Sequence, residues 1–389
     1  AKAALFPSLS FSTSQQVVNR PYQETSSRVS GSEIISSNSK TSYNGNYGLN
    51  ASWTLYNGNK RLKTIQQEKL NNQVAELDVA TSENNIQESI AQVYIQILYA
   101  AESVKVNEST LQVSIAQRDR GQELLNAGSI AKSDFAQLEA QVSTDRYQLV
   151  TAQATLEDYK LQLKQLLELD GENEMNIYLP ALSDENVLAP LPTKKDVYIR
   201  ALSLRPEIEA SKLNVEASEL GIGIAKSSYL PTISLSAGIG TNHTSGSDFT
   251  FGEQVKNGWN NSIGLSVSVP IFNNRQTKSA VQKAKLQYET SMLSLLDEQK
   301  TLYKTIEGLW LDANSAQQRY AAANEKLKST QISYELISEQ FNLGMKNTIE
   351  LLTEKNNLLQ AQQEQLQAKY MAILNMQLLK FYQGDQLAI

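Results

Sequence analysis

Four segments of the chain alternate between apolar and polar positions, a pattern that predicts β-strands with one apolar and one polar face. The apolar positions are Leu9 and Phe11; Tyr47, Leu49, Ala51, Trp53 and Leu55; Ile233, Leu235, Ala237 and Ile239; and Ile263, Leu265, Val267, Val269 and Ile271. The positions between them are almost all Ser, Gly, Asn or Thr. Small polar residues suit a crowded, wet lumen, so we expect the apolar face to lie against lipid. The alternative is the edge of a soluble β-sandwich.

Aromatic residues stand where such strands would leave a membrane. Tyr56 and Phe272 occupy matching positions after the second and fourth segments, and Trp53 lies within the second. We expect all three at a membrane interface. Four strands are too few for a closed transmembrane barrel, which needs about eight or more. The chain is therefore expected to complete a barrel with other copies of itself, and its long helices favour more than two.

Long helices follow each strand pair. Residues 59–126 contain no proline and one glycine, Gly121, and their apolar residues recur at coiled-coil spacings. This helix would be about 100 Å long. Return helices of about 60 Å are expected over 129–168 and 345–382, and a lead-in helix of about 50 Å over 195–227. Asp145 is the one polar interruption in the heptads of the first return helix.

The chain is an internal repeat. Residues 47–70 match residues 263–286 at an offset of 216, and Gly128 and Gly344 share that offset. Each glycine ends an outgoing helix and begins a turn. We divide the chain into a first repeat (1–168), a proline-containing linker (169–194), a second repeat (195–382) and a tail (383–389). The first repeat lacks a lead-in helix, so we expect about 30 residues to be missing before it, which leaves a lipid anchor there open.

Composition excludes several classes of function. There is no cysteine and a single histidine, His243, in a polar stretch, so we expect no metal site, no cofactor and no enzyme. A net charge of −6 without a dense Lys/Arg cluster predicts no nucleic-acid partner. No run approaches the roughly 18 apolar residues of a transmembrane helix.

The order of strand pair, long helix, glycine turn and return helix, twice over, resembles the TolC-like outer membrane efflux proteins. The stretches YLPTISLSAG and FNLGMKNTIELL carry the resemblance, which covers nearly the whole chain. It implies a mainly α fold with a β-barrel portion, in which three copies form a twelve-stranded transmembrane β-barrel and an α-barrel of helical hairpins. It also implies an exit duct for drug efflux or type I secretion that extends from the outer membrane into the periplasm. An adaptor protein would dock at the helix turns, and an inner-membrane transporter would supply the energy.

The resemblance further implies which residues meet the adaptor and close the duct. The adaptor contacts would be Ala127–Gly128 and Leu343–Gly344.

At the closed end the family bonds an acid on the first return helix to a basic residue just after the second turn glycine, here Asp134 and Lys346. The family's tyrosine in this network is here Phe341, which has no hydroxyl to donate. Glu350 matches an acid that faces the closed pore, whereas the next position of that ring is Thr353, so the acidic ring should be weak.

Two alternatives stay open. Three copies of Glu350 near one axis would focus a negative potential and raise the carboxylate pKa values. Asp134 and Glu350 could instead only complement helix dipoles, a stabilisation of about 0.3–1 kcal/mol each. For the whole protein, the alternative function is a periplasmic coiled-coil adaptor or tether without a pore.

Overall fold

The computed structural model describes residues 2–22, 26–30, 33–37, 40–169, 177–178, 180 and 187–387. Its described residues are mostly helical, with one four-stranded sheet and one two-stranded sheet. Contacts divide the chain into two compact units, which cut across the two repeats. The first unit comprises Ala1–Val74 and Ser211–Ser294, and the second comprises Ala75–Ala210 and Leu295–Ile389.

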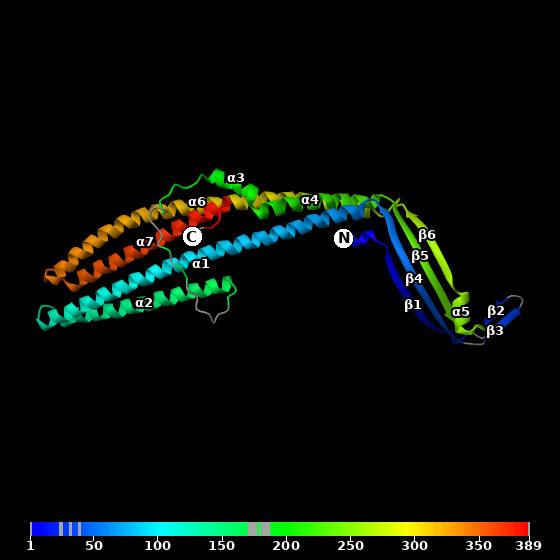
Figure 1. Ribbon diagram of the computed structural model, residues 1–389, viewed down its shortest axis with the longest axis horizontal. Coiled ribbons are helices and arrows are strands. Elements are labelled where there is room, and N and C mark those ends of the chain that lie inside the picture. The colour runs from blue at the N-terminus through cyan, green and yellow to red at the C-terminus, as the bar shows by residue number, and fades with distance from the viewer. Residues whose placement is uncertain are drawn as a thin grey trace. The chain divides into compact units, whose positions relative to one another are not determined.

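The larger sheet, in the first unit, has the strand order β1-β4-β5-β6, and all its pairs are antiparallel (Figure 1). Its strands are β1 (Ser8–Asn19), β4 (Thr41–Asn57), β5 (Thr232–Thr244) and β6 (Asn260–Ser268). The register pairs apolar residues with apolar residues in one row and small polar residues in the next. One row across the sheet is Leu9, Ala51, Ala237 and Ile263, and the neighbouring row is Ser8, Ser52, Ser236 and Gly264.

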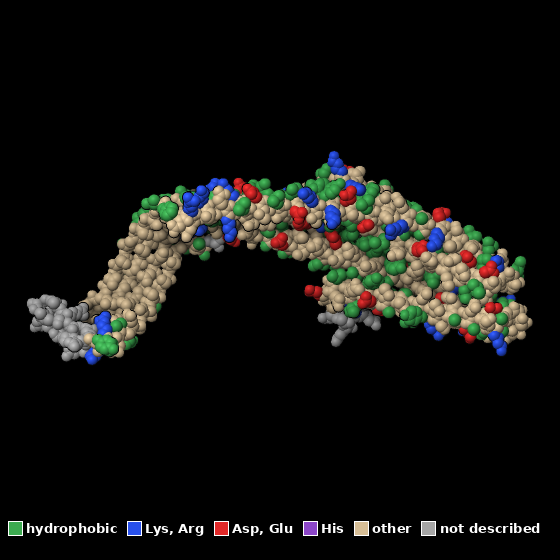
Figure 2. Space-filling view, turned by 180° about the vertical axis from the view of Figure 1, so that it is seen from behind, with side chains coloured by type: hydrophobic (Ala, Val, Ile, Leu, Met, Phe, Trp, Pro, Cys, Tyr) green, Lys and Arg blue, Asp and Glu red, His purple; other side chains and the backbone are tan. Residues whose placement is uncertain are grey.

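Residues directly opposite each other share a face, so these rows separate an apolar face from a face of small polar residues. The middle of the sheet is tan in Figure 2, the colour of uncharged polar side chains and backbone, as expected of the polar face. On the apolar face Phe11 is 68% exposed and Ile263 is 78% exposed. The predicted two-faced sheet is confirmed, and several of its large apolar side chains are largely exposed in the described part of the chain.

A β-bulge at Leu55 changes the face of the next residue. Thr54 pairs with Ser234, but Tyr56 pairs with Ile233, so Leu55 has no partner of its own. A bulge adds one residue to one strand and re-aims the side chains after it. Tyr56 therefore shares the apolar face with Ile233, although simple alternation would put it on the polar face.

The other two predicted interface aromatics differ in setting. Trp53 pairs with Leu235 and donates its indole N–H to the backbone oxygen of Leu5 at 2.8 Å. Phe272 is 78% exposed and lies beyond β6. Their placement at a membrane interface stays a prediction.

The fourth strand is shorter than the alternating pattern predicts. It ends at Ser268, so Val269 and Ile271 lie outside it, because Pro270 has no N–H for the ladder and restricts the residue before it. The segments between the paired strands also contain regular structure. The antiparallel pair β2 (Ser26–Ser30) and β3 (Glu33–Ser37) lies between β1 and β4, and the short helix α5 (Phe251–Asn257), capped by Thr250 and Glu253, lies between β5 and β6.

The helical hairpins of the two repeats have equal lengths. Helices α1 (Lys60–Asn126) and α6 (Gln276–Asn342) each have 67 residues, and the return helices α2 (Lys132–Leu166) and α7 (Thr348–Tyr382) each have 35. The bounds agree with the predicted ones to within three residues. The lengths are equal because all four pairs of helix ends keep the offset of 216 residues that separates the two turn glycines.

The predicted single lead-in helix is wrong in one respect, since it is divided into α3 (Lys194–Leu204) and α4 (Pro206–Lys226). Pro206 lacks an N–H and disfavours a helical conformation at Arg205, whose φ of −74° and ψ of 124° are extended. Arg205 is buried at the break, donates to Glu88 at 3.0 Å and Glu207 at 2.8 Å, and lies 4.1 Å from the ring of Tyr382.

Side chains join the helices within each unit. In the first unit, Lys63 and Gln67 of α1 donate to backbone oxygens of α4, the latter at 2.8 Å. In the second unit, two apolar clusters join α1, α3, α6 and α7. The predicted linker lies partly outside the described residues, namely at 170–176, 179 and 181–186, as does the end of the tail at 388–389. The described end of the linker packs on α6, where Trp310 donates to Pro192 and Gln317 to Val187.

Gly121 permits close packing of the first hairpin. A Cβ on this residue would lie 2.4 Å from Cδ1 of Leu138, which is 1% exposed and cannot swing away freely. We predict that Gly121→Ala overpacks this contact and lowers the free energy of unfolding by about 1–3 kcal/mol. Thermal unfolding followed by circular dichroism measures the change.

Gly308 of α6 provides the matched control, because a Cβ there would meet nothing within 4 Å. Gly308→Ala should stabilise the protein by up to about 1 kcal/mol through helix propensity alone. Equal effects of the two substitutions would show that the contact of Gly121 with Leu138 does not limit the packing.

Candidate gate at the helix turns

The two helix turns are built alike. The N–H of Gly128 bonds to Leu125 O and that of Ser129 to Leu124 O, and in the second hairpin Gly344 bonds to Phe341 O and Met345 to Gln340 O. These are the paired bonds of a Schellman motif. Both glycines have a φ of 73°, a left-handed conformation that a side chain would strain. The glycines therefore end the outgoing helices, as the sequence predicts.

The four predicted adaptor-contact residues, Ala127, Gly128, Leu343 and Gly344, are all exposed, and Leu343 is 74% exposed. Near Leu343, Met345 and Ile349 are 72% and 62% exposed. The second turn thus presents large apolar side chains to solvent. Contact with an adaptor stays a prediction.

The two predicted acids begin the return helices. Glu350 accepts the N–H of Asn347 at 3.3 Å, and the Asn347 side chain accepts the N–H of Glu350 at 2.9 Å, so α7 starts with a complete capping box. On α2, Asp134 accepts the N–H of Ala131 at 3.4 Å, but an alanine side chain returns no bond. Both acids therefore do cap helix N-termini, the simpler of the two roles that the sequence leaves open.

Lys346 is paired within its own turn. Its Nζ lies 2.5 Å from Oε1 of Glu350, and in the described part of the chain no ion pair joins it to Asp134. The bond from Lys346, followed by the N–H of Asn347, holds the pKa of Glu350 below its usual value. Within one chain this is opposite to the rise expected for three clustered carboxylates. Gate bonding of Asp134 to Lys346 stays a prediction.

Phe341 is buried rather than part of a polar network. It is 3% exposed and packs with Leu138 of the first hairpin and Leu351 of α7. The partly buried Leu124 and Tyr334 adjoin this cluster, and Gln117 of α1 donates to the hydroxyl of Tyr334 at 2.8 Å. The side chain that cannot donate a hydrogen bond thus joins the two hairpins by apolar contact close to the turns.

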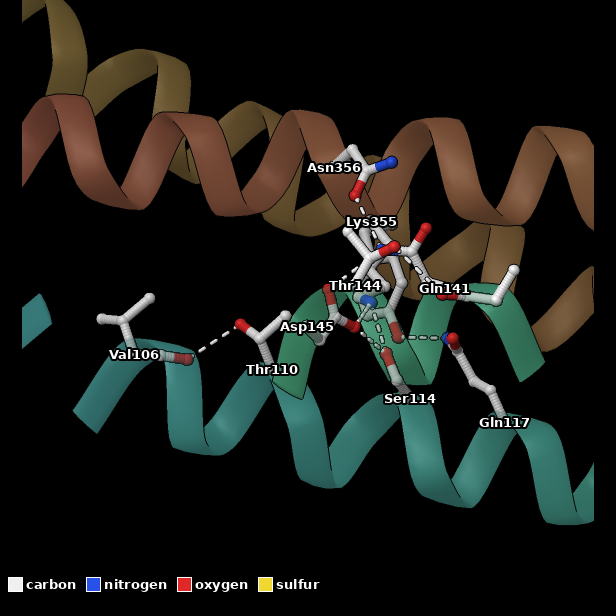
Figure 3. Close-up of polar contacts among 11 residues, drawn as sticks. Val106, Thr110, Ser114, Gln117, Gln141, Thr144, Asp145, Lys355 and Asn356 are labelled. Atoms are coloured by element: carbon white, nitrogen blue, oxygen red, sulfur yellow. Dashed lines mark hydrogen bonds and ion pairs between the residues drawn. The ribbon is translucent and has the colours of Figure 1, made fainter. Parts of the chain in front are cut away.

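A buried polar cluster joins the same hairpins and was not predicted. Ser114 of α1, Asp145 of α2 and Lys355 of α7 are 2%, 1% and 3% exposed. Figure 3 shows them pointing toward one another between the three helices. Lys355 Nζ donates to the Asp145 carboxylate and to Ser114 Oγ, and Ser114 donates to Asp145. Burial lowers the pKa of Lys355, and its contact with Asp145 opposes this shift.

The sequence identifies only one of the two charged residues of this cluster. Asp145 stands out as a polar residue in a heptad core, and a buried carboxylate requires a partner. Its partner, however, lies 210 residues away on a different helix. Nothing in the spacing of either helix identifies Lys355 as that partner.

Two kinds of feature are not found among the described residues. They contain no group of three or more His, Cys, Asp or Glu residues placed to hold a metal ion. No helix among them has an apolar stretch long enough to span a bilayer.

Comparison with known families decides the identity. The family model described as outer membrane efflux protein matches residues 1–168 and 197–384. The chain belongs to the outer membrane efflux protein family. This confirms the resemblance drawn from the strand and turn motifs, and the family is one of channel proteins rather than enzymes. As an outer membrane efflux protein, the chain is assigned to the outer membrane.

Individual relatives are distant but extend over most of the chain. The outer membrane efflux protein BepC of Brucella suis is 24% identical over 290 residues, 74% of this chain and 60% of BepC. The outer membrane protein TolC of Escherichia coli is 23% identical over 311 residues, 78% of this chain and 62% of TolC. The chain thus spans about three fifths of the length of these two relatives.

A solved relative has the same fold. The outer membrane channel CmeC of Campylobacter jejuni superimposes with a TM-score of 0.77 and 18% identity, covering 100% of this chain and 80% of CmeC. The predicted fold class, mainly α with paired hairpins and a strand portion, is confirmed.

The capping box of α7 predicts a local pH dependence. The pKa of Glu350 is lower in the folded protein than its ordinary value of 4.5. The ionised Glu350 therefore stabilises the start of α7 at a pH above 4.5, and this stabilisation is lost as pH falls through the lowered pKa. Amide hydrogen exchange of residues 347–351, corrected for the intrinsic rate, should accelerate between about pH 6 and about pH 3. Glu350→Gln should remove this dependence, and an unchanged profile in that variant would contradict the assignment.

Proposed function

We propose that the chain is a protomer of an outer membrane channel-tunnel, the exit duct of a tripartite drug efflux pump or a type I secretion system. The observation that carries the proposal is the four-stranded sheet. One of its faces is apolar and exposed, the other bears small polar residues, and β1 and β6 each have a single neighbour. A water-filled barrel in lipid needs such faces, and it leaves no open edge.

The assembly we propose is a homotrimer. Three copies of the sheet give twelve strands, above the minimum of about eight for a transmembrane barrel. The helical hairpins of the three copies would continue the barrel as an α-barrel in the periplasm. The repeat division at 1–168 and 195–382 then supplies two equal hairpins per copy, and the linker 169–194 and tail 383–389 form a belt beside them. The packing of the described linker end on α6 supports this belt.

The proposed partners are a periplasmic adaptor, which docks at the exposed turns, and through it an inner-membrane transporter that supplies energy. Among relatives, AprF of Pseudomonas aeruginosa is named for alkaline protease secretion and ArpC of Pseudomonas putida for an antibiotic efflux pump. Cargo of either kind needs a passive conduit, whose selectivity comes from width and lining charge. The duct itself performs no chemistry.

The proposed gate lies at the turns. Asp134 of one hairpin and Lys346 of the other bond when the duct is closed, and adaptor contacts replace this bond on opening. Lys346 already bonds to Glu350, so it would link two acids, with Glu350 facing the pore. Phe341 supports this arrangement from the apolar cluster behind it.

A tether or adaptor without a pore is not favoured. Such a protein would have no use for strands with an exposed apolar face, and the outer membrane efflux family matches both repeats rather than a single hairpin.

Ion conductance in planar lipid bilayers tests the duct and its gate. The full-length protein should form channels, and Asp134→Ala combined with Lys346→Ala should raise the single-channel current, because the closing bond is lost. The matched control is Glu325→Ala combined with Lys328→Ala, which removes an exposed ion pair on α6. The control should conduct like the parent.

Two results would contradict the proposal in different ways. Parent protein without channel activity would exclude the duct. Equal currents in the parent and the gate variant would remove Asp134 and Lys346 from the gate while leaving the duct intact.

A further inference from the structure

The buried cluster of Ser114, Asp145 and Lys355 joins three helices and both hairpins of one chain. Between this cluster and the turns, the two hairpins also meet through the apolar cluster of Leu138, Phe341 and Leu351. On its other side they meet through the larger apolar cluster that joins α1 to α6 and α7. Leu351 and Lys355 are one helical turn apart, and Leu138 and Asp145 two turns apart, so each pair shares a helix face. The polar cluster therefore adjoins the apolar one on the side away from the turns.

Both carboxylate oxygens of Asp145 are hydrogen-bonded. One carboxylate oxygen of Asp145 accepts bonds from both Lys355 and Ser114, and the other accepts from Gln141 at 2.9 Å. Gln141 also donates to Asn356 of α7, at 3.5 Å. A buried ion pair that also makes further hydrogen bonds is directional, and removal of one partner leaves an uncompensated buried charge. Apolar contacts lack this directional requirement.

The cluster occurs once per chain although the chain is a repeat. At the offset of 216 residues, the positions equivalent to Asp145 and Lys355 are Ala361 and Glu139. Ala361 is buried and Glu139 is exposed, so no comparable pair exists there. The bonding is thus specific to the contact of α7 with the first hairpin, and it breaks the equivalence of the two hairpins.

We infer that the Asp145–Lys355 ion pair, completed by Ser114, is a positioning lock that fixes the second hairpin to the first within each chain. The inference rests on the proposed function for its consequence, which is that opening bends the helices only between the lock and the turns. Residues 115–144 and 341–354 would then move during opening, whereas the hairpins stay joined at the lock. Lys355 would affect opening by fixing the position of the hairpins, without contacting cargo itself.

Spin labels test the lock directly, because the chain has no cysteine and a cysteine pair can be introduced without background. Ala127→Cys and Leu343→Cys place one label on each exposed turn. Labelled chains diluted with unlabelled ones report the distance within a chain by double electron–electron resonance. The otherwise unchanged protein should give a single narrow distance peak, and Lys355→Met should lose that peak to a broad distribution.

Two further variants make the experiment decisive. Lys326→Met, which breaks the exposed pair of Lys326 with Glu364 at 2.8 Å between α6 and α7, should keep the narrow peak. Asp145→Leu combined with Lys355→Met leaves no unpaired buried charge, so it guards against a failure of Lys355→Met to fold. This double variant should also broaden the distribution, because apolar side chains pack without the directional bonds of the lock.

The outcomes separate the lock from the duct. A narrow peak in Lys355→Met, or in the double variant, would show that packing alone joins the hairpins and would overturn the inference. The parent protein without the two cysteine substitutions is also tested for channel current in bilayers. Loss of the narrow peak on substitution in a parent that conducts supports both statements, whereas the same loss in a parent that does not conduct supports the lock and contradicts the duct.

Discussion

The structure depends on the backbone groups at the edges of its four-stranded sheet. Among the described residues, β1 and β6 each pair with one neighbour, and each therefore has a row of unpaired N–H and C=O groups on its other side. In water such an edge can be hydrated, but in hydrocarbon each unpaired group costs several kcal/mol. The exposed apolar face supports the proposal that this sheet lies in lipid. In that proposal, further copies of the chain close the barrel.

The helices satisfy a different constraint, since every hairpin of a closed assembly has to reach the same level. Equal lengths of α1 and α6, and of α2 and α7, meet this requirement within one chain. Identical Schellman turns end both outgoing helices. Near the turns the equivalence is lost, because α7 has a complete capping box and a buried lysine, whereas α2 has half a capping box and a buried aspartate. In the proposed gate, this difference would decide which of the two hairpins moves.

Much of this architecture could be predicted from the sequence because it arises from local periodicity. Alternation placed the four strands, heptads placed the hairpins, and Gly128 and Gly344 located the turns. The division of the lead-in helix at Pro206 was also a local signal. It was missed because the residues on both sides of the proline have a helical pattern. The bulge at Leu55 was not predictable, because it depends on how β4 meets β5. The bonds among Ser114, Asp145 and Lys355 were equally hidden, because they depend on which helices lie together and not on the pattern of any one.

In the proposed assembly, three copies of the sheet close one barrel. The mass of the detergent-solubilised full-length protein, corrected for bound detergent, measures the number of copies. We expect a particle of three chains, in which twelve strands leave no edge unpaired. A single chain that stays soluble without detergent would exclude the barrel, because its apolar strand face and two open edges would then lie in water.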